Sequence, residues 1–264
     1  MISINSFQLF KADFKRFVLN YKIVLAIVGV IATLGVSANE YIMSGINATY
    51  LVERSIFSLF PTQLILIVAS FPVVSSFVED WEFRYLYNIA MRSGTKEYSI
   101  IRLFFAFITS FGITFIGCMI FFGIAFIYYP LLNEGHPIEY QVYPPYSELA
   151  YTSFPASYTI ARIIIYSLSA GFWTIVGLFV STLIPNKFVA YVSPFIVNYF
   201  VSFSSFLLPR MLQEDVVSRS RVVFPDSGFW PHFVYFIVYY IILILIVGWE
   251  FYRMVIRRLS NELL

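Results

Sequence analysis

Residues 103–129 read LFFAFITSFGITFIGCMIFFGIAFIYY and contain no Asp, Glu, Lys or Arg. A helix rises about 1.5 Å per residue, so roughly 20 apolar residues cross the ~30 Å hydrocarbon core of a bilayer. This run therefore predicts a membrane-spanning helix. The composition agrees, because the chain is 59% hydrophobic and only 12% charged, whereas average soluble domains carry about 25% charged residues.

Further apolar runs lie on both sides of this one and predict an all-α membrane protein with six transmembrane helices. The whole chain, residues 1–264, is expected to form a single transmembrane domain. The predicted spans cover approximately residues 23–43, 56–78, 103–129, 163–184, 188–208 and 233–252. Pro72 and Pro194 are each expected to kink or break a span, because proline removes a helical hydrogen bond. The loop 185–187 is so short that the helices it joins should be antiparallel neighbours.

The distribution of Lys and Arg predicts the orientation of the chain. With both termini inside, twelve of the seventeen Lys and Arg residues fall in inner segments and five in outer segments. Inner segments of membrane proteins are enriched in these residues. We therefore expect a multi-pass membrane protein with both termini in the cytoplasm.

The segment before the first span, residues 1–21, has the periodicity of an amphipathic helix. Four phenylalanines recur at helical spacing on one face, and basic residues occupy the other: Phe7, Phe10, Phe14 and Phe17 against Lys11, Lys15 and Arg16. This pattern predicts an interfacial helix on the cytoplasmic leaflet. It could serve as a simple lipid anchor or as an elbow that also contacts a cytoplasmic partner.

Residues 77–102 read FVEDWEFRYLYNIAMRSGTKEYSIIR and hold eight of the 32 charged residues of the chain. Aromatic side chains such as Trp81 and Tyr85 are typical anchors of protein interfaces. The neighbouring charges could set the register and rate of docking. Ser93 and Gly94 are expected to end a helix, with Thr95 capping the next span. The alternative is an ordinary solvated loop whose aromatics anchor it to the membrane.

Several chemistries find no support in the sequence. No G-x-x-x-x-G-K-[ST] motif occurs, so we expect no nucleotide site on this chain, and we identify no catalytic, cofactor-binding or metal-binding residues. A net charge of +2 is too small to indicate nucleic-acid binding. Arg162 and Glu250, at the ends of predicted spans, are expected to reach the membrane interface. Nearly bare spans offer no obvious site for ion coupling. The chain is not expected to be an enzyme.

This layout resembles the permease subunit of an ABC-2 type transporter, with the architecture of a type V exporter. The resemblance is most specific in Phe77-Val78-Glu79-Asp80, in Arg92-Ser93-Gly94-Thr95, and in Tyr98 and Arg102. It implies that residues 79–101 form a cytoplasmic coupling segment that docks on an ATPase subunit. The residues expected to make this interface are Glu79, Asp80, Trp81, Glu82, Arg84, Tyr85, Arg92 and Gly94.

The resemblance also implies a location in the bacterial cytoplasmic membrane, and it implies the partners of the chain. Two ATPase subunits carrying ATP and Mg²⁺ would pair with two permeases, the second being another copy or a homologue. The expected cargo is hydrophobic or amphipathic: a peptide, an antibiotic or drug, or a lipid-linked molecule. A polysaccharide or teichoic-acid type permease and a non-transporting membrane scaffold are the alternatives.

Two outer segments have no single interpretation. Residues 130–158 form a loop rich in Tyr and Pro, whose aromatics could anchor it to headgroups or contact a substrate. Residues 209–231 mix charges of both signs with valines. That segment could re-enter the membrane edge as short helices or form a plain polar loop.

Overall fold

The structure is a computed structural model, and it describes residues 6–41, 47–132, 146–151, 154, 156–213, 216–217, 223–224 and 228–262. Within these ranges every regular element is helical, which confirms the all-α prediction. In the outer segments 130–158 and 209–231, residues 133–145, 152–153, 155, 214–215, 218–222 and 225–227 lie outside the described residues. Their predicted roles therefore stay predictions.

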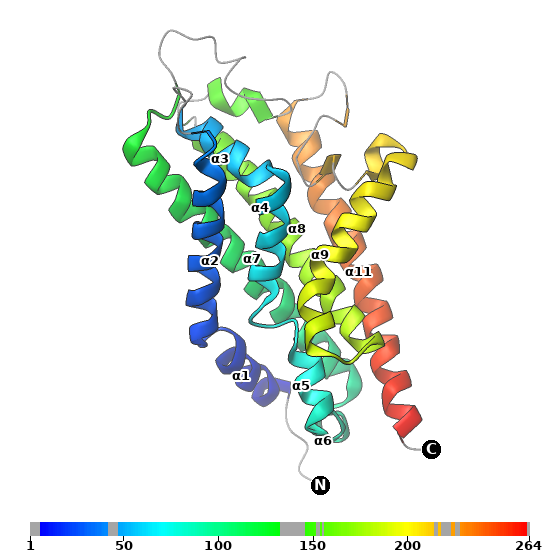
Figure 1. Ribbon diagram of the computed structural model, residues 1–264. Helices are drawn as coiled ribbons and strands as arrows, with labels where there is room; N and C mark the ends of the chain where they lie inside the picture. The colour runs from blue at the N-terminus through cyan, green and yellow to red at the C-terminus, as the bar shows by residue number, and fades with distance from the viewer. Residues whose placement is uncertain are drawn as a thin grey trace.

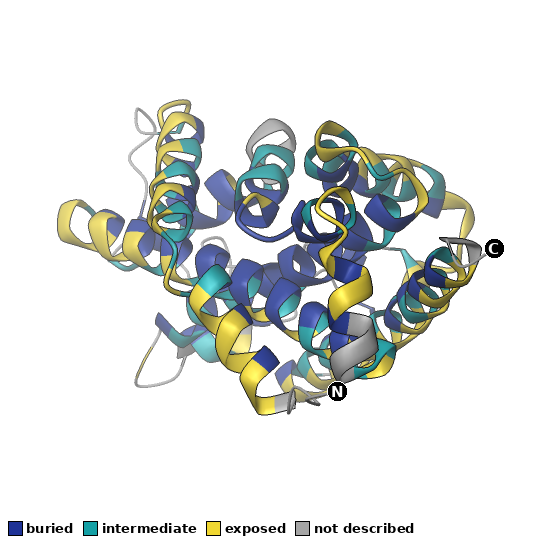
Figure 2. Cartoon of the chain, turned by 90° about the horizontal axis from the view of Figure 1, so that it is seen from below, coloured by how far each residue is buried: buried dark blue, intermediate teal, exposed yellow. Residues whose placement is uncertain are grey.

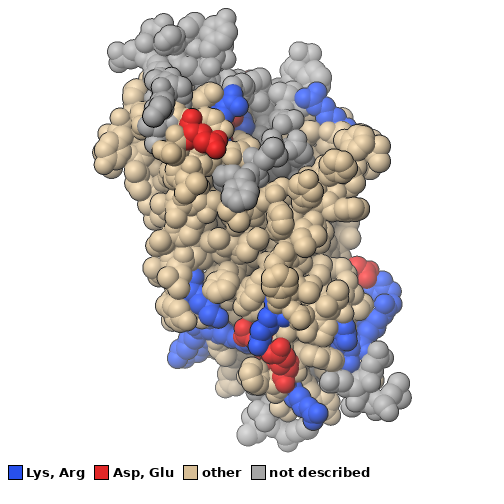
Figure 3. Space-filling model, in the orientation of Figure 1, with Lys and Arg blue, Asp and Glu red and all other residues tan. Residues whose placement is uncertain are grey.

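Five helices of the described chain are long and apolar enough to cross a membrane. They are α2 (Tyr21–Ala38), α7 (Thr95–Tyr128), α8 (Ala156–Leu183), α9 (Lys187–Ser204) and α11 (Phe229–Glu262). Figure 3 shows Lys, Arg, Asp and Glu gathered toward the two ends of the face in view, with a band of other residues between them. This distribution is typical of a multi-pass membrane protein.

The predicted span over residues 56–78 is wrong as a continuous helix. The chain there forms α3 (Ala48–Phe57), α4 (Leu59–Ser70) and α5 (Ser76–Glu82), with a turn at residues 71–75. Figure 1 shows α3 and α4 following one another beside α2, with α5 continuing below them toward α6. Pro72 lies in the turn, where it cannot donate a helical hydrogen bond. The expected break at Pro72 is therefore confirmed, whereas α9 continues through Pro194.

One end of the bundle carries α1 (Ser6–Phe17), α5 and α6 (Tyr85–Ser93), and the last turns of α11 also reach it (Figure 1). We call this the α5–α6 end. The expected helix before the first span is confirmed as α1. The expected break at Gly94 is confirmed too, since Gly94 has φ +89° between α6 and α7. Gly94 itself is the residue before α7, so Thr95 is the first helical residue rather than the cap.

The predicted neighbours on either side of loop 185–187 do pack together as α8 and α9. The Asn186 side chain accepts hydrogen bonds from the backbone N–H of Phe188 and of Val189, which caps α9. A short 3₁₀ helix, η3 (Tyr146–Tyr151), packs on α8 and α11 at the opposite end.

Helix α8 is the centre of the bundle and packs against α4, α7, α9 and α11. Figure 2, viewed along the bundle, shows buried residues gathered in the middle and exposed residues on the outer helices. Glycines allow the close approach of α7 to α8. A Cβ atom placed on Gly171 would lie 2.7 Å from the Phe107 ring and 3.2 Å from its carbonyl oxygen.

We expect Gly171→Val to lower the thermal unfolding temperature of the detergent-solubilised protein. The added methyl groups must push α7 away from α8, and overpacking of this kind typically costs about 1–3 kcal/mol. Gly123→Val, on the same helix as Phe107, is the matched control because a Cβ there meets nothing within 4 Å. Equal unfolding temperatures for the two variants would contradict this account of the packing.

Candidate functional site

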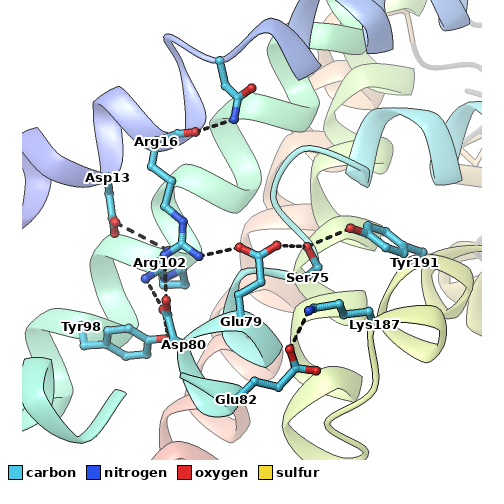
Figure 4. A network of polar contacts seen from close by, with 11 residues as sticks. Asp13, Arg16, Ser75, Glu79, Asp80, Glu82, Tyr98, Arg102, Lys187 and Tyr191 are labelled. Carbon is cyan, nitrogen blue, oxygen red and sulfur yellow. Dashed lines mark hydrogen bonds and ion pairs between the residues drawn. The ribbon is translucent and has the colours of Figure 1, made fainter. Parts of the chain in front are cut away.

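The charged residues of the α5–α6 end form a buried network that joins four helices (Figure 4). We call its six central residues the polar cluster: Asp13 and Arg16 from α1, Glu79 and Asp80 from α5, and Tyr98 and Arg102 from α7. The cluster connects further to α9 through Ser75 and Tyr191. Sequence reasoning had placed several of these charges on a surface available to a partner.

Asp80 is the residue on which the polar cluster converges. Its Oδ2 accepts hydrogen bonds from Arg102 Nη2 and, at 2.9 Å, from the Tyr98 hydroxyl. Its Oδ1 accepts one at 2.7 Å from Arg16 Nη1. Arg102 is 0% exposed and Asp80 is 2% exposed, so this ion pair is interior. Charged groups buried in this way require partners, because desolvation is costly.

Arg16 ties the N-terminal helix to α5 with both arms of its guanidinium group. While Nη1 donates to Asp80, Nη2 donates to Glu79 Oε2 at 2.7 Å. Glu79 Oε1 in turn accepts a hydrogen bond at 2.9 Å from Ser75, whose hydroxyl accepts one at 3.1 Å from Tyr191. Polar contacts thus run from α1 through α5 to α9.

Arg102 is also surrounded by aromatic rings. Its guanidinium carbon lies 5.0 Å from the ring centroid of Phe17 and 5.0 Å from that of Tyr98. Cation–π contacts of this kind are strongest when the cation is desolvated. Phe17 is therefore buried against the Arg102 guanidinium group and does not form part of the lipid-facing surface of α1.

The polar cluster contains one more carboxylate than guanidinium groups, and Asp13 is the carboxylate with the weakest pairing. The three carboxylates face two guanidinium groups, and the Asp13 Oδ1 is 3.6 Å from Arg102 Nη1. The Asp13 Oδ2 is buried without a hydrogen-bond partner among the described residues. Burial raises the pKa of the Asp13 carboxyl; Arg102 opposes this rise and the nearby charge of Asp80 adds to it.

Glu79 shows the opposite behaviour. Burial by itself would raise its pKa, but hydrogen bonds from Arg16 and Ser75 outweigh burial and lower the pKa below the ordinary value. A carboxylate with a lowered pKa stabilises the fold above its unfolded-state pKa, and that contribution is lost as the pH falls through the lowered value. Glu79 is therefore expected to be ionised at neutral pH, where its ion pair with Arg16 stabilises the folded state.

The turn between α5 and α6 projects from the polar cluster and exposes aromatic side chains. We call residues 82–87 the tip. Phe83 is 77% exposed, Tyr85 49% and Tyr87 39%. Arg84 is exposed and has φ +52°, a left-handed conformation that costs a non-glycine residue roughly 1–2 kcal/mol. The tip thus exposes three aromatic side chains together with Glu82 and Arg84 on a sharply defined turn.

The predicted coupling residues separate into interior and exposed groups. Glu79 and Asp80 belong to the polar cluster, and Trp81 is half-buried, with its ring stacked on Phe77 and the Arg258 guanidinium 5.5 Å away. Glu82 is exposed and pairs with Lys187 at 2.6 Å. Arg84 and Tyr85 lie in the tip, Gly94 is the residue before α7, and the side chain of Arg92 lies outside the described part of the structure.

The four phenylalanines predicted for the interfacial helix also separate. Phe7 is exposed, Phe17 is buried under Arg102, and Phe10 and Phe14 are partly exposed against α7. The centroid of the Phe10 ring lies 5.0 Å from that of Phe105, so α1 packs on α7 through aromatic contacts. The four phenylalanines form one apolar stripe in the sequence pattern, but in the structure Phe17 packs under Arg102, whereas Phe10 packs against α7 and remains partly exposed.

A second buried ion pair lies in the bundle and corrects the expectation for Arg162. Helix α8 begins at Ala156, so Arg162 is inside the helix. Arg162 Nη2 is 2.9 Å from Glu53 of α3, which also accepts a hydrogen bond at 2.7 Å from Tyr158. Arg162 is buried rather than extended to an interface. Glu250, in contrast, is half-exposed and pairs locally with Arg253 at 2.9 Å.

No family model, curated protein or solved structure matches this chain. Within the described part of the chain, no three His, Cys, Asp or Glu side chains are grouped as a metal ion would require. The carboxylates of the polar cluster are engaged with guanidinium groups instead. Any proposal for function therefore rests on the sequence pattern and on the geometry of the α5–α6 end.

Sequence reasoning missed Asp13 and Glu53 as partners of the buried arginines. The position of Asp13 carried a signal, because it lies on the helical strip of Leu9 and Phe17, both buried, and is the acid of a basic helix. Asp13 is four residues from each of these two buried apolar residues, so it lies on the same helix face. An acidic side chain on a buried face needs a charged partner, because buried charges are almost always paired. Nothing comparable marked Glu53, whose partner Arg162 is far away in the sequence.

We expect Asp80→Asn to destabilise the protein strongly. The substitution leaves Arg102 buried with less compensating charge, and breaking a buried pair in this way costs about 3–5 kcal/mol. Glu82→Gln is the matched control because it breaks the exposed pair with Lys187, and such pairs contribute about 0–1 kcal/mol. Thermal unfolding in detergent measures both. Similar losses for the two variants would contradict a central role for Asp80.

We expect Asp13→Asn to raise the unfolding temperature at pH 7 to 8. A carboxyl with a raised pKa destabilises the fold when ionised, and this cost disappears below its ordinary pKa of about 3.9. The difference between variant and wild type should therefore shrink as the pH is lowered toward 4. A loss of stability at neutral pH comparable with that of Asp80→Asn would show that the charge of Asp13 is needed.

Proposed function

We propose that this chain is the transmembrane permease subunit of an ATP-driven ABC-2 type exporter. The observation that carries the proposal is the tip, an exposed aromatic turn at the end of the bundle, supported by a buried ionic cluster. In this proposal the tip is the docking element for a separate ATPase subunit. Segments α3 to α5 provide a sixth, broken passage through the membrane, with both termini in the cytoplasm.

The chemistry of the tip supports a docking role. Large apolar side chains on a rigid support are the usual anchors of protein interfaces, and Phe83 and Tyr85 are both exposed and only two residues apart. Arg84 between them adds a charge that can set register with an acidic partner. A free loop would not need the polar cluster behind it, since rigidity matters when a surface must fit a partner.

The polar cluster supports a role in transmission. Asp80 joins the base of the tip to α7 through Arg102 and to α1 through Arg16. A movement of α5 imposed by a docked ATPase would therefore displace α1 and α7 together, because breaking these buried pairs is costly. In this proposal Glu79 and Asp80 position the tip, and the direct contacts with the ATPase come from Phe83, Arg84 and Tyr85.

The absence of a P-loop motif from the sequence supports a separate energy source. ATP and Mg²⁺ would be held by the ATPase subunits, and a second permease copy or homologue would complete the transporter. The apolar bundle suits a hydrophobic or amphipathic cargo. A polysaccharide or teichoic-acid cargo would use the same tip and the same cluster.

The test replaces the exposed aromatics without disturbing the cluster. We expect the double variant Phe83→Ser, Tyr85→Ser to lose at least roughly tenfold in affinity for its ATPase, since truncating interface anchors typically costs 2 kcal/mol or more. The tagged full-length chain is purified from its native membrane, a P-loop ATPase is identified in the complex, and stimulated ATP hydrolysis is measured in nanodiscs.

Phe154→Ser is the control, because Phe154 is 60% exposed and precedes α8 at the other end of the bundle. It should leave ATPase binding and hydrolysis unchanged. Normal stimulated hydrolysis by the double variant would refute the docking role of the tip. Recovery of an intact membrane complex without any ATPase would refute the exporter proposal and favour a scaffold.

A further inference from the structure

An apolar groove separates α1 from α7 on the outside of the bundle. Its volume is about 390 Å³, within the ~300–1,000 Å³ typical of ligand sites. It is lined by α1, by Val18 in the turn that follows α1, by the start of α2 and by the middle of α7. The lining residues are Phe10, Phe14, Val18, Ile23, Phe104, Phe105, Ile108, Thr109, Gly112, Ile113 and Ile116.

The length of the groove matches one leaflet of a bilayer. On α7 the lining runs from Phe104 to Ile116, a rise of roughly 18 Å at 1.5 Å per residue. One leaflet contributes about 15 Å of the ~30 Å hydrocarbon core. An elongated apolar groove of this length is suited to one extended acyl chain.

The lining is apolar and open toward the surroundings of the bundle. Phe10, Phe14 and Phe104 are each between 38% and 49% exposed, so their rings form walls with one side uncovered. Thr109 also borders the groove, but its hydroxyl oxygen is buried, so the exposed lining is apolar. Gly112 forms part of the floor, and a Cβ placed on it would meet nothing within 4 Å.

Positive charges lie beside the end of the groove that α1 forms. Lys11 and Lys15 are exposed and follow directly after Phe10 and Phe14 in the sequence. At 100° per residue, each lysine lies on the strip of α1 next to the groove-lining phenylalanines. Lysines at a membrane surface attract anionic headgroups and gain about fivefold in binding for each charge.

We propose that this groove binds one acyl chain of an anionic phospholipid, with Lys11 and Lys15 holding its headgroup. The apolar lining, the leaflet-matched length and the flanking cations all point to this occupant. The bound lipid would fasten α1 to α7 from outside, where the polar cluster fastens the same helices from inside. This site depends on the membrane setting of the bundle and not on the proposed transport function.

The experiment uses the full-length protein in nanodiscs that contain a photo-crosslinking phosphatidylglycerol or a phosphatidylcholine with identical acyl chains. We expect phosphatidylglycerol to label the α7 segment 104–116 preferentially, as mapped by mass spectrometry. Gly112→Leu should fill the groove and reduce this labelling about tenfold. Gly123→Leu is the matched control because its site is equally open but outside the lining, and labelling of 104–116 should persist.

A second pair of variants tests the headgroup contact. Lys11→Gln with Lys15→Gln should abolish the preference for phosphatidylglycerol while labelling by phosphatidylcholine persists. Lys96→Gln, an exposed lysine of α7 outside the groove, should keep the preference. Equal labelling of wild type and Gly112→Leu, an unchanged headgroup preference in the double variant, or a groove-dependent peptide or drug recovered in place of lipid would each overturn the proposal.

Discussion

The ion pair between Asp80 and Arg102 is the contact on which the α5–α6 end depends. Both side chains are buried, and removing either would leave a charge in the interior without its principal partner. Arg16 adds α1 by donating to the other carboxylate oxygen, Oδ1, and Tyr98 donates to the same Oδ2 as Arg102. The orientation of α1, the start of α7 and the position of the tip all follow from this one carboxylate.

The charged residues at the start of the loop between the second and third predicted spans are largely buried, although the composition of that loop indicates an aqueous environment. The residues exposed at its turn include aromatic ones, although a solvent-exposed turn usually favours polar side chains. Phe83 and Tyr85 are exposed beyond the cluster, while Glu79 and Asp80 point inward. The inversion is physically consistent, because Asp80 and Glu79 are paired with Arg102 and Arg16, and these pairs hold the exposed aromatics on a rigid base. A surface with that character is more useful to a partner than a flexible charged loop.

Helix α1 contacts the rest of the bundle through two different surfaces. Its inner strip, with Asp13 and Phe17, closes over Arg102, while Phe10 and Phe14 face an apolar groove. One amphipathic helix therefore makes two kinds of contact: an electrostatic contact with Arg102 on its inner strip and an apolar contact along the groove. Asp13, whose carboxyl has a raised pKa because of burial, lies on the inner strip of α1.

The sequence by itself determined the helical class, the positions of five long apolar helices, the helix α1 and the breaks at Pro72 and Gly94. These follow from local properties: apolar length, amphipathic period, a missing N–H and a left-handed φ. The tertiary structure alone decided that the second predicted span is also interrupted at Ser58, that Asp80 and Arg162 are interior, and that Asp13 and Glu53 lie beside the buried arginines. Such pairs join residues up to 109 positions apart, and no local pattern states which distant charge will be brought within 3 Å of another.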